Sequence, residues 1–333
     1  MSVRRHRPAG IVPLEVWDVV VAGTPLHLQP SAAQPAAIAA IVQQLRDGAA
    51  IRKRGQALPA LPIERVVVAG GGDVAAVVAA IAATGIEAHA ATEPVHIGRV
   101  GGLELVRDLH GDVEQRDVLV VDVGQTSIKW FVNGRTERVA RPAELLLEVD
   151  ARASRDDVDW RGRCVAFIAG TIRSSFLCMT NDVRRPAAIV LALPCEIDGD
   201  DDVASALPVP PLPSGRGGKG VRQGSEGVRA VGVEVVVPAS SQDGLTPQPP
   251  LPEGRGGAER RPSLRVAGCS YPWPDHDPHL IADILAAADV VAVPAVVLND
   301  AELAAVSVRV AGFGVGTLVL TIGLGVGGAF IAA

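Results

Sequence analysis

The sequence predicts an α/β protein built from short buried strands that end in glycine-rich turns. In one stretch, an apolar strand at Arg65–Ala69 is followed by a glycine turn, a helical segment and a second strand at Ile86–Ala90. Such an order is typical of a parallel sheet covered by helices. In residues 116–132 and again in 317–331, an apolar strand runs into a polar or glycine turn and then into a second apolar strand. These stretches predict sheets whose functional groups lie in the turns at strand ends.

Composition limits the classes of function that fit. The chain has 333 residues, which is enough for two domains with substantial cores. Its net charge is −6 and no basic stretch dominates, so a nucleic-acid partner is not expected. The four cysteines form no C-x-x-C pair, and we expect them to be buried small side chains of a cytoplasmic protein without structural zinc. The composition leaves oligomerisation open.

Apolar runs and turn residues predict further elements. Strands are expected at Val19–Gly23, Thr136–Ala140, Val165–Ala169, Ala188–Leu193, Val290–Val293 and Val296–Leu298. Helices are expected at Ala36–Leu45, Val74–Ala83 and Asp283–Ala288, with Ser31 as the cap of the first and Asp47-Gly48 as its end. The run Asp275–His279 is expected to be a solvated loop, because no spaced partner supports a zinc site.

The first glycine turn is a candidate nucleotide-binding element. Gly70, Gly71 and Gly72 follow the strand at Arg65–Ala69 and precede a predicted helix. Free N–H groups at a helix start, together with the helix dipole, favour an anion. The alternative is that the glycines only allow the strand and the helix to pack closely.

The stretch Arg116–Val132 predicts a hairpin with a polar turn. An apolar strand ends on Asp122, and Gly124, Gln125 and Thr126 follow; Lys129 lies on the returning strand, and Asn133-Gly134 then predicts a type I′ turn. The backbone N–H groups of the polar turn can face phosphate oxygens, and Asp122 can hold Mg²⁺ through water. The alternative is an ordinary hairpin, with Asp122 at the start of its turn and Lys129 as a surface charge.

Residues 207–262 differ in composition from the rest of the chain. Proline, glycine, serine and arginine dominate there, and the segment at 210–218 recurs almost unchanged at 249–257. Such a composition buries too little apolar area to offset chain entropy, so we expect a disordered insert.

The C-terminal part contains a second candidate site. An apolar strand ends on Asn299-Asp300, and a helical stretch follows in which Glu302 is expected to be exposed as a partner of the helix dipole. A carboxylate at this strand end can act as a base toward a bound hydroxyl, or Asn299 or Asp300 can simply cap the helix.

Residues 310–333 carry no charge, and a C-terminal membrane anchor is the minor alternative to a glycine-turn hairpin. The seven glycines between Gly312 and Gly328 favour the hairpin.

In their order and spacing these motifs resemble the superfamily of sugar kinases, Hsp70 and actin ATPases, and are most similar to its ROK branch of sugar kinases and repressors. The resemblance covers about residues 116–200 and 264–333. It implies two RNase H-like domains around a cleft, ATP and Mg²⁺ as cofactors, and phosphorylation of a sugar or similar small polyol.

The resemblance also implies a role for each motif. Phosphate loop one would comprise Asp122, Gly124, Gln125, Thr126 and Lys129, and phosphate loop two would comprise Gly323, Gly325, Gly327 and Gly328. Asp300 would be the catalytic base and Asn299 would bind a sugar hydroxyl. The sequence departs from the usual residues of the family at Gln125, Cys195, Glu196 and Leu324.

The order of the segments differs from that of the family. Residues 60–110, with the turn Gly70–Asp73, resemble the adenosine segment, which in the family follows phosphate loop two near the C-terminus. We therefore expect a circular permutation. In it, 1–112 are the adenosine-segment-like region, 113–206 are the first ATPase-like domain with phosphate loop one, 207–262 are the insert, and 263–333 are the remainder with the Asn-Asp segment and phosphate loop two. The alternatives are a separate N-terminal domain joined to a truncated kinase, and a non-catalytic sensor or regulator of the same fold that binds nucleotide or sugar.

Overall fold

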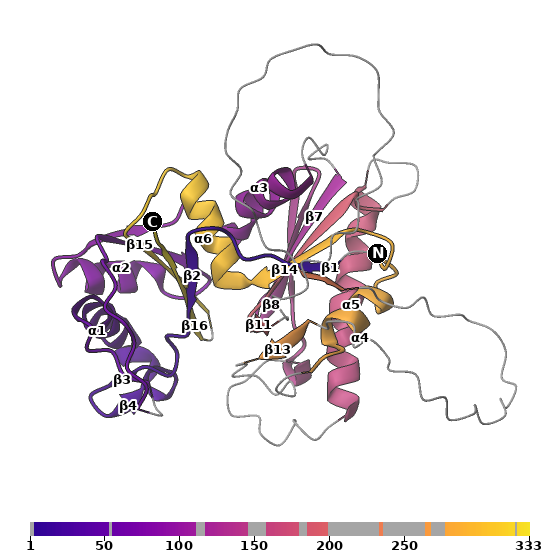
Figure 1. Ribbon diagram of the computed structural model, residues 1–333. Coiled ribbons are helices and arrows are strands. Elements are labelled where there is room, and N and C mark those ends of the chain that lie inside the picture. The colour runs from indigo at the N-terminus through magenta and orange to yellow at the C-terminus, as the bar shows by residue number, and fades with distance from the viewer. Residues whose placement is uncertain are drawn as a thin grey trace, which may run out of the picture.

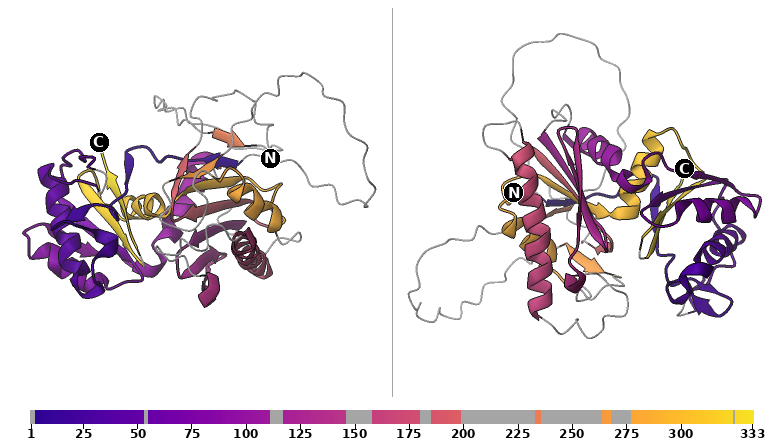
Figure 2. Two further views of the ribbon diagram at one scale, coloured as in Figure 1. Left: turned by 90° about the horizontal axis from the view of Figure 1, so that it is seen from below. Right: turned by 180° about the vertical axis from the view of Figure 1, so that it is seen from behind.

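The computed structural model describes residues 3–52, 55–110, 117–145, 158–179, 185–198, 233–235, 264–267, 277–323 and 325–333. This part of the chain forms a seven-stranded and a five-stranded mixed sheet together with helices, so the protein is of the α/β class (Figure 1). The outer face of the larger sheet is covered by α4 (Val158–Ser175) and α5 (Leu280–Ala287), and that of the smaller sheet by α1 (Gln34–Asp47) and α2 (Val74–Ala82). Helices α3 (Gly98–His110) and α6 (Asp300–Val310) lie between the two sheets (Figure 2).

The larger sheet has the strand order β12-β1-β14-β10-β7-β8-β9. Its strands are β12 (Val233–Val235), β1 (Val3–Arg5), β14 (Ala295–Asn299), β10 (Ala188–Leu193), β7 (Val118–Val123), β8 (Ser127–Val132) and β9 (Arg135–Ala140). The smaller sheet has the order β2-β16-β15-β5-β6, with β2 (Ile11–Leu14), β16 (Val326–Ile331), β15 (Thr317–Ile322), β5 (Arg65–Gly70) and β6 (Glu87–Ala90). Two short pairs complete the described strands, β3 (Val20–Val21) with β4 (Thr24–Pro25) and β11 (Glu196–Asp198) with β13 (Arg265–Ala267).

The two sheets share one pattern of strand directions. In the run β9-β8-β7-β10-β14 the first two pairings are antiparallel and the next two are parallel. The run β2-β16-β15-β5-β6 has the same directions in the same order. As a result, β1, β14, β10 and β7 end at one edge of their sheet, and β2, β15, β5 and β6 end at one edge of theirs. Ligands of α/β proteins bind outside such carboxyl ends of strands.

Strand residues alternate between two hydrophobic cores, because successive side chains point to opposite faces of a sheet. In β7, Leu119 and Val121 face the core beneath α4 and α5, whereas Val118 and Val120 face the core that contains α3 and α6. Strands covered on both faces are expected to be continuously apolar, as β10 and residues 118–121 of β7 are.

Several predicted turns and caps are confirmed. Asn133 and Gly134 have φ values of 52° and 76°, as a type I′ turn requires. Helix α1 ends at Gly48 in the left-handed conformation with φ 69°. Helix α2 begins after the predicted glycine turn, and the side chain of Asp73, which was not predicted as a cap, caps it by accepting a hydrogen bond from the N–H of Ala76 at 3.0 Å.

Other predicted elements were wrong. Val165–Ala169 is part of α4, where Trp160, Cys164, Ile168 and Ile172 recur at helical spacing and are buried. The cap of α1 is Ala33 rather than Ser31, and it has no side-chain cap. Residues 290–293 form turns rather than a strand, and only Val20–Val21 is extended within 19–23.

Asp277 is buried rather than part of a solvated loop. One of its carboxylate oxygens accepts from Arg161 Nε at 2.6 Å, and the other accepts from the backbone N–H groups of His279 and Leu280. These bonds hold the pKa of Asp277 below its usual range against the opposing effect of burial. Asp275 and His276 lie outside the described residues.

The predicted insert and the C-terminal segment are described in unequal detail. Within 207–262 the structure describes only β12, which pairs antiparallel with β1, so the predicted disorder otherwise lies outside the described residues. The uncharged C-terminal stretch forms the β15–β16 hairpin. No helix in the described ranges is long and apolar enough to cross a membrane.

The N-terminal residues share both sheets with later parts of the chain. Strand β1 lies beside β14, while β2 pairs with β16 and β5 pairs with β15. The N–H of Ala332 donates to the carbonyl oxygen of Gly10 at 2.7 Å, which places residue 332 against the segment between β1 and β2. The limits 112, 206 and 262 stay predictions, but residues 11–14 and 65–70 do not form a sheet of their own.

Candidate functional site

A cavity of about 520 Å³ lies where turns at the carboxyl edges of the two sheets meet. Its volume falls within the range of roughly 300–1,000 Å³ that is typical of small-molecule sites. The predicted site residues that line it are Gly70, Gly71, Asp122, Gly124, Gln125, Thr126, Lys129, Asn299, Asp300, Gly323, Gly325, Gly327 and Gly328. Gly72 was predicted with them but is not among the lining residues. Leu324 lies outside the described residues.

The three glycines after β5 have different environments. Gly70 has a φ of 112°, and a Cβ there would lie 2.0 Å from the carbonyl oxygen of Ile322. A Cβ on Gly72 would lie 2.6 Å from Ile322 Cγ2, so both glycines are required for packing against β15. A Cβ on Gly71 would meet nothing within 4 Å. Gly71 is therefore the glycine at which a side chain would fill the cavity without a clash.

The two hairpin turns contact each other across the cavity. A Cβ added to Gly325, in the β15–β16 turn, would lie 2.9 Å from Gln125 Nε2, in the β7–β8 turn. A Cβ added to Gly327 would lie 2.5 Å from Thr321 Oγ1 and 3.6 Å from Asp300 Oδ1. Glycine at these positions lets backbone from the smaller sheet approach side chains of the larger one.

Asp122 and Lys129 form an ion pair at the cavity wall. They are direct cross-strand partners on β7 and β8, and Lys129 Nζ lies 2.7 Å from Asp122 Oδ2. Their side chains are 17% and 18% exposed, so both remain accessible from the cavity. The pair places a carboxylate and an ammonium beside the turn 124–126, where a metal–phosphate group would need both.

Asp300 is the first residue of α6 and faces the cavity. Although its side chain keeps some exposure to the cavity, it lies below the molecular surface. That burial raises the pKa of Asp300 to about 7, with the nearby charge of Asp122 as the second cause and Lys129 opposing. A carboxyl group with a pKa near 7 can exchange a proton at neutral pH, as a general base requires.

Asn299 is the cap of α6, which agrees with the alternative that the sequence left open. Its Oδ1 accepts from the N–H of Ala301 at 2.8 Å, and its Nδ2 donates to the carbonyl oxygen of Cys195 at 2.9 Å. The amide thereby joins the end of β14 to the segment after β10. Its predicted role in sugar binding stays a prediction, and any ligand would have to share these polar atoms.

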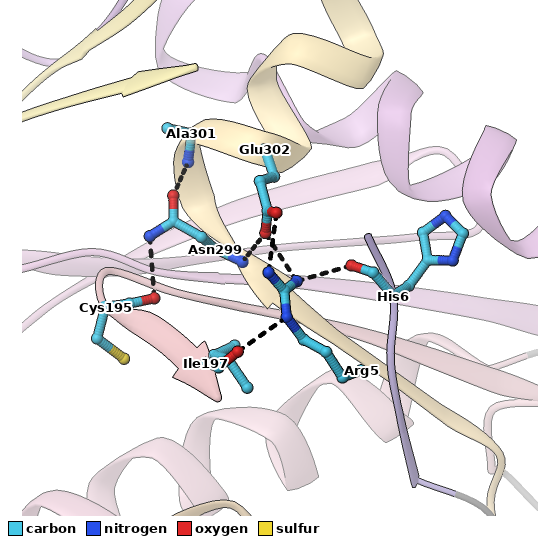
Figure 3. A network of polar contacts seen from close by, with 7 residues as sticks. All are labelled: Arg5, His6, Cys195, Ile197, Asn299, Ala301 and Glu302. Carbon is cyan, nitrogen blue, oxygen red and sulfur yellow. Dashed lines mark hydrogen bonds and ion pairs between the residues drawn. The ribbon is translucent and has the colours of Figure 1, made fainter. Parts of the chain in front are cut away.

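A buried ion pair lies beside Asn299 (Figure 3). Arg5 Nη1 and Nη2 donate to the two carboxylate oxygens of Glu302 at 2.7 and 2.8 Å, and Glu302 also accepts from the N–H of Asn299. Glu302 is 0% exposed and Arg5 is 4% exposed, so the expectation of an exposed Glu302 was wrong. Glu302 completes a capping box and the remaining Arg5 bonds go to carbonyl oxygens of His6 and Ile197.

Sequence reasoning missed several residues of the cavity wall. These are Arg5, Glu15, Trp17, His27, Arg52 and Arg138. Only Arg138 stands on an element that the sequence assigned correctly, and it lies opposite Lys129 on β9. The others belong to the first 52 residues, where the sequence carries no recognisable motif.

The wall is compatible with Mg²⁺ and a nucleotide phosphate. In the described part of the chain, no three His, Cys, Asp or Glu side chains gather as a closed metal site. Mg²⁺ is usually held by one or two carboxylates together with water and phosphate oxygens. Asp122, beside the turn 124–126 at the cavity wall, fits that donor set.

Comparisons with models of protein families, with curated proteins and with solved structures found no match.

The raised pKa of Asp300 predicts a pH-dependent stability effect. The folded chain keeps the Asp300 proton up to about pH 7, whereas the unfolded chain releases it near pH 4. In this window stability falls as pH rises, because the folded state binds more protons than the unfolded state. Asp300→Asn should therefore raise the free energy of unfolding relative to wild type by about 2–4 kcal/mol more at pH 8 than at pH 4. Denaturant titrations at both pH values test this; an equal difference at the two pH values would contradict it.

Breaking the Arg5–Glu302 pair should cause a large loss of stability, and a second substitution that removes the remaining charge should restore part of it. Glu302→Gln leaves the guanidinium of Arg5 buried without its counter-charge, which should cost about 3–5 kcal/mol. The double variant Arg5→Met/Glu302→Gln removes that charge and should be more stable than Glu302→Gln alone. Urea unfolding of wild type, the two single variants and the double variant measures both effects, and additive losses would show that the two residues do not interact.

Proposed function

We propose that the protein transfers a phosphoryl group from ATP, with Mg²⁺, to a hydroxyl group of a sugar or similar small polyol. One observation carries the proposal. Glycine-containing turns from two sheets that share a five-strand pattern meet in one cavity, beside the buried carboxyl group of Asp300. Phosphoryl transfer requires positioned phosphates, compensation of their charge and a base for the attacking hydroxyl.

We further propose that the two sheets belong to two RNase H-like domains. The equal order and direction of five strands in each sheet support an internal duplication. In the larger sheet these strands follow the chain as β7, β8, β9, β10 and β14. In the smaller sheet the same order is obtained only by starting at β15 and β16 and continuing from the N-terminus with β2, β5 and β6. This cyclic order supports the circular permutation, as does the contact between Gly10 and Ala332.

Each group of residues that lines the cavity would have its own role in the reaction. The turns at 124–126 and 323–325 would hold the phosphates, with Asp122 binding Mg²⁺ through water. Gly70 and Gly71 would lie against the nucleoside. Bound Mg²⁺ would compensate the phosphate charge. Before Mg²⁺ binds, the ammonium of Lys129 would neutralise the charge of Asp122. Asp300 would accept the proton of the attacking hydroxyl.

A non-catalytic sensor is the second candidate. Both polar ends of the Asn299 amide have protein partners, and Asp122 is already paired with Lys129. A cavity with these groups engaged can bind nucleotide or sugar and still transfer no phosphate. Measured turnover separates the two candidates.

The kinase proposal predicts ATP-dependent phosphorylation that depends on Asp300. With ATP, Mg²⁺ and a panel of sugars and polyols, wild type should turn over at least one acceptor. Asp300→Asn should lower kcat by about 10²–10⁴, the usual contribution of a general base. The wild-type rate should rise with pH to a plateau above about pH 7, where the Asp300 carboxyl group is ionised. Acceptor binding by calorimetry without turnover in wild type would favour the sensor.

The position of Gly71 predicts a selective effect on nucleotide binding. Gly71→Val adds a branched side chain to the cavity wall and contacts no other residue within 4 Å of its Cβ. It should weaken ATP binding at least about tenfold, which corresponds to about 1.4 kcal/mol, with an unchanged melting temperature. Gly162→Val, a similarly open glycine on α4 away from the cavity, is the matched control. Calorimetry with ATP and Mg²⁺ measures the effect; equal affinity in the two variants would remove Gly71 from the nucleotide site.

A further inference from the structure

The cavity wall contributed by the smaller sheet has two parts, one on each side of the β15–β16 hairpin. The strand order places β5 on one side of the hairpin and β2 on the other. Gly70 and Gly71 follow β5 on the first side. Side chains that follow β2 line the cavity on the second side, and we call these residues, Glu15, Trp17, His27 and Arg52, the β2 subsite.

The rings of the β2 subsite are held rigidly against each other. The ring of His27 lies edge-on to that of Trp17, with centroids 5.0 Å apart and an interplanar angle of 60°. The backbone N–H of His27 donates to the carbonyl oxygen of Trp17 at 3.0 Å, and His27 Nδ1 lies 3.0 Å from the same oxygen. A carbonyl oxygen can only accept, so Nδ1 carries the proton. In the neutral ring Nε2 is then an acceptor for a hydroxyl group.

The charges beside the two rings disfavour an anionic ligand. Arg52 lies 2.9 Å from Glu15 and 3.6 Å from Asp18, so one guanidinium faces two carboxylates. Farther along the same cavity, Asp122 and Asp300 lie with the basic side chains of Arg5, Lys129 and Arg138, so the excess of carboxylates is a property of the β2 subsite alone. A carboxylate that is partly exposed, as that of Glu15 is at 30%, accepts hydrogen bonds from hydroxyl groups.

The β2 subsite lies on the side of the cavity where Asp300 stands. Strand β1 is the neighbour of β14, whose end carries Asn299 and Asp300, and residues 6–10 lead directly from β1 to β2. Figure 1 shows β2 beside α6, the helix that Asp300 begins. Pro194, Cys195 and Arg5 line the cavity from the larger sheet on this side.

From this arrangement we propose that the β2 subsite binds the phosphoryl acceptor, and that the acceptor is a neutral cyclic polyol. The apolar face of its ring stacks on Trp17, while hydroxyl groups donate to Glu15 and to His27 Nε2. Another hydroxyl then points toward Asp300. The proposal rests on the proposed function, since it assigns the acceptor part of the same cavity. It gives the N-terminal segment after β2 a function that the sequence motifs did not indicate.

The test compares acceptor and nucleotide binding in matched variants. Calorimetry is run on the full chain, loaded with Mg²⁺ and a non-hydrolysable ATP analogue, with D-glucose, D-ribose and myo-inositol as neutral rings and D-gluconate as an anion. At least one neutral ring should bind, and more tightly than gluconate. Trp17→Leu should weaken its binding about tenfold or more, whereas Trp17→Phe, which keeps a stacking ring, should weaken it less than about threefold. His27→Phe keeps the ring contact and removes the acceptor nitrogen, so it should also weaken binding.

Affinity for the ATP analogue separates this proposal from the proposed function. It should be unchanged in all three variants. The proposal is overturned if the neutral rings bind wild type and Trp17→Leu alike, if gluconate binds best, or if the analogue binds and no neutral ring does. It is also overturned if a folded Trp17→Leu protein loses the analogue, because the β2 subsite would then hold the nucleotide. Failure of wild type to bind the analogue would overturn the kinase function alone, provided that ring binding still depends on Trp17. If Trp17→Leu does not fold, the comparison of His27→Phe with wild type decides.

Discussion

The buried ion pair between Arg5 and Glu302 fixes the position of the helix on which the candidate site depends. It joins the end of β1 to the first turn of α6, and Glu302 also holds the N–H of Asn299 at the end of β14. Removing one partner of such a pair destabilises the fold by more than the intact pair stabilises it, because the remaining buried charge has neither a partner nor water to solvate it. Asp300 lies between Asn299 and Glu302 in sequence, and both of these residues are held by hydrogen bonds. The first turn of α6 therefore holds Asp300 at the cavity.

Close backbone packing is the second constraint on the site. Glycines of α3 allow that helix to lie against α6 and β7, since a Cβ on Gly101 would lie 2.6 Å from the carbonyl oxygen of Leu303 and a Cβ on Gly102 would lie 2.5 Å from Val120 Cγ2. Helices α3 and α6 thereby fill the layer between the sheets, and their common core includes residues of both. The lack of a side chain at Gly325 likewise lets the β15–β16 hairpin approach Gln125 of the β7–β8 hairpin. A cavity lined by both sheets requires the layer of α3 and α6 between them to be thin.

The parts that sequence reasoning predicted are those with local signals. The predicted turns each follow an apolar strand within a few residues, and the cavity brings together Gly70 and Gly71, residues 124–126, and Gly323 and Gly325, as expected. The parts that it missed depend on long-range pairing. Arg5 and Glu302 are separated by 297 positions, so no local pattern connects them. A signal was available at Asn299 and Glu302, whose spacing is that of a capping box and predicts a bonded rather than a free glutamate.

Errors in secondary structure had two origins, a stretch of sequence taken too short and strand pairing that the sequence does not show. The run 165–169 is apolar and short, which suits a strand, but the wider spacing of Trp160, Cys164, Ile168 and Ile172 matches a helix. The strands β1 and β2 are short, and their pairing with β14 and β16 stabilises them more than their own composition does. Trp17 and His27 follow β2, and no motif indicated that the segment after it turns back to the cavity.

The most direct test of the account is amide hydrogen exchange on the full chain with and without ATP and Mg²⁺. The account predicts slower exchange in three segments that are distant in sequence, around 70–72, around 124–126 and around 323–325, because one nucleotide would contact turns of both sheets. Exchange in α4 and α5, on the far side of the larger sheet, should not change. Protection confined to the turns of one sheet, or absent from all three, would contradict a shared nucleotide cavity.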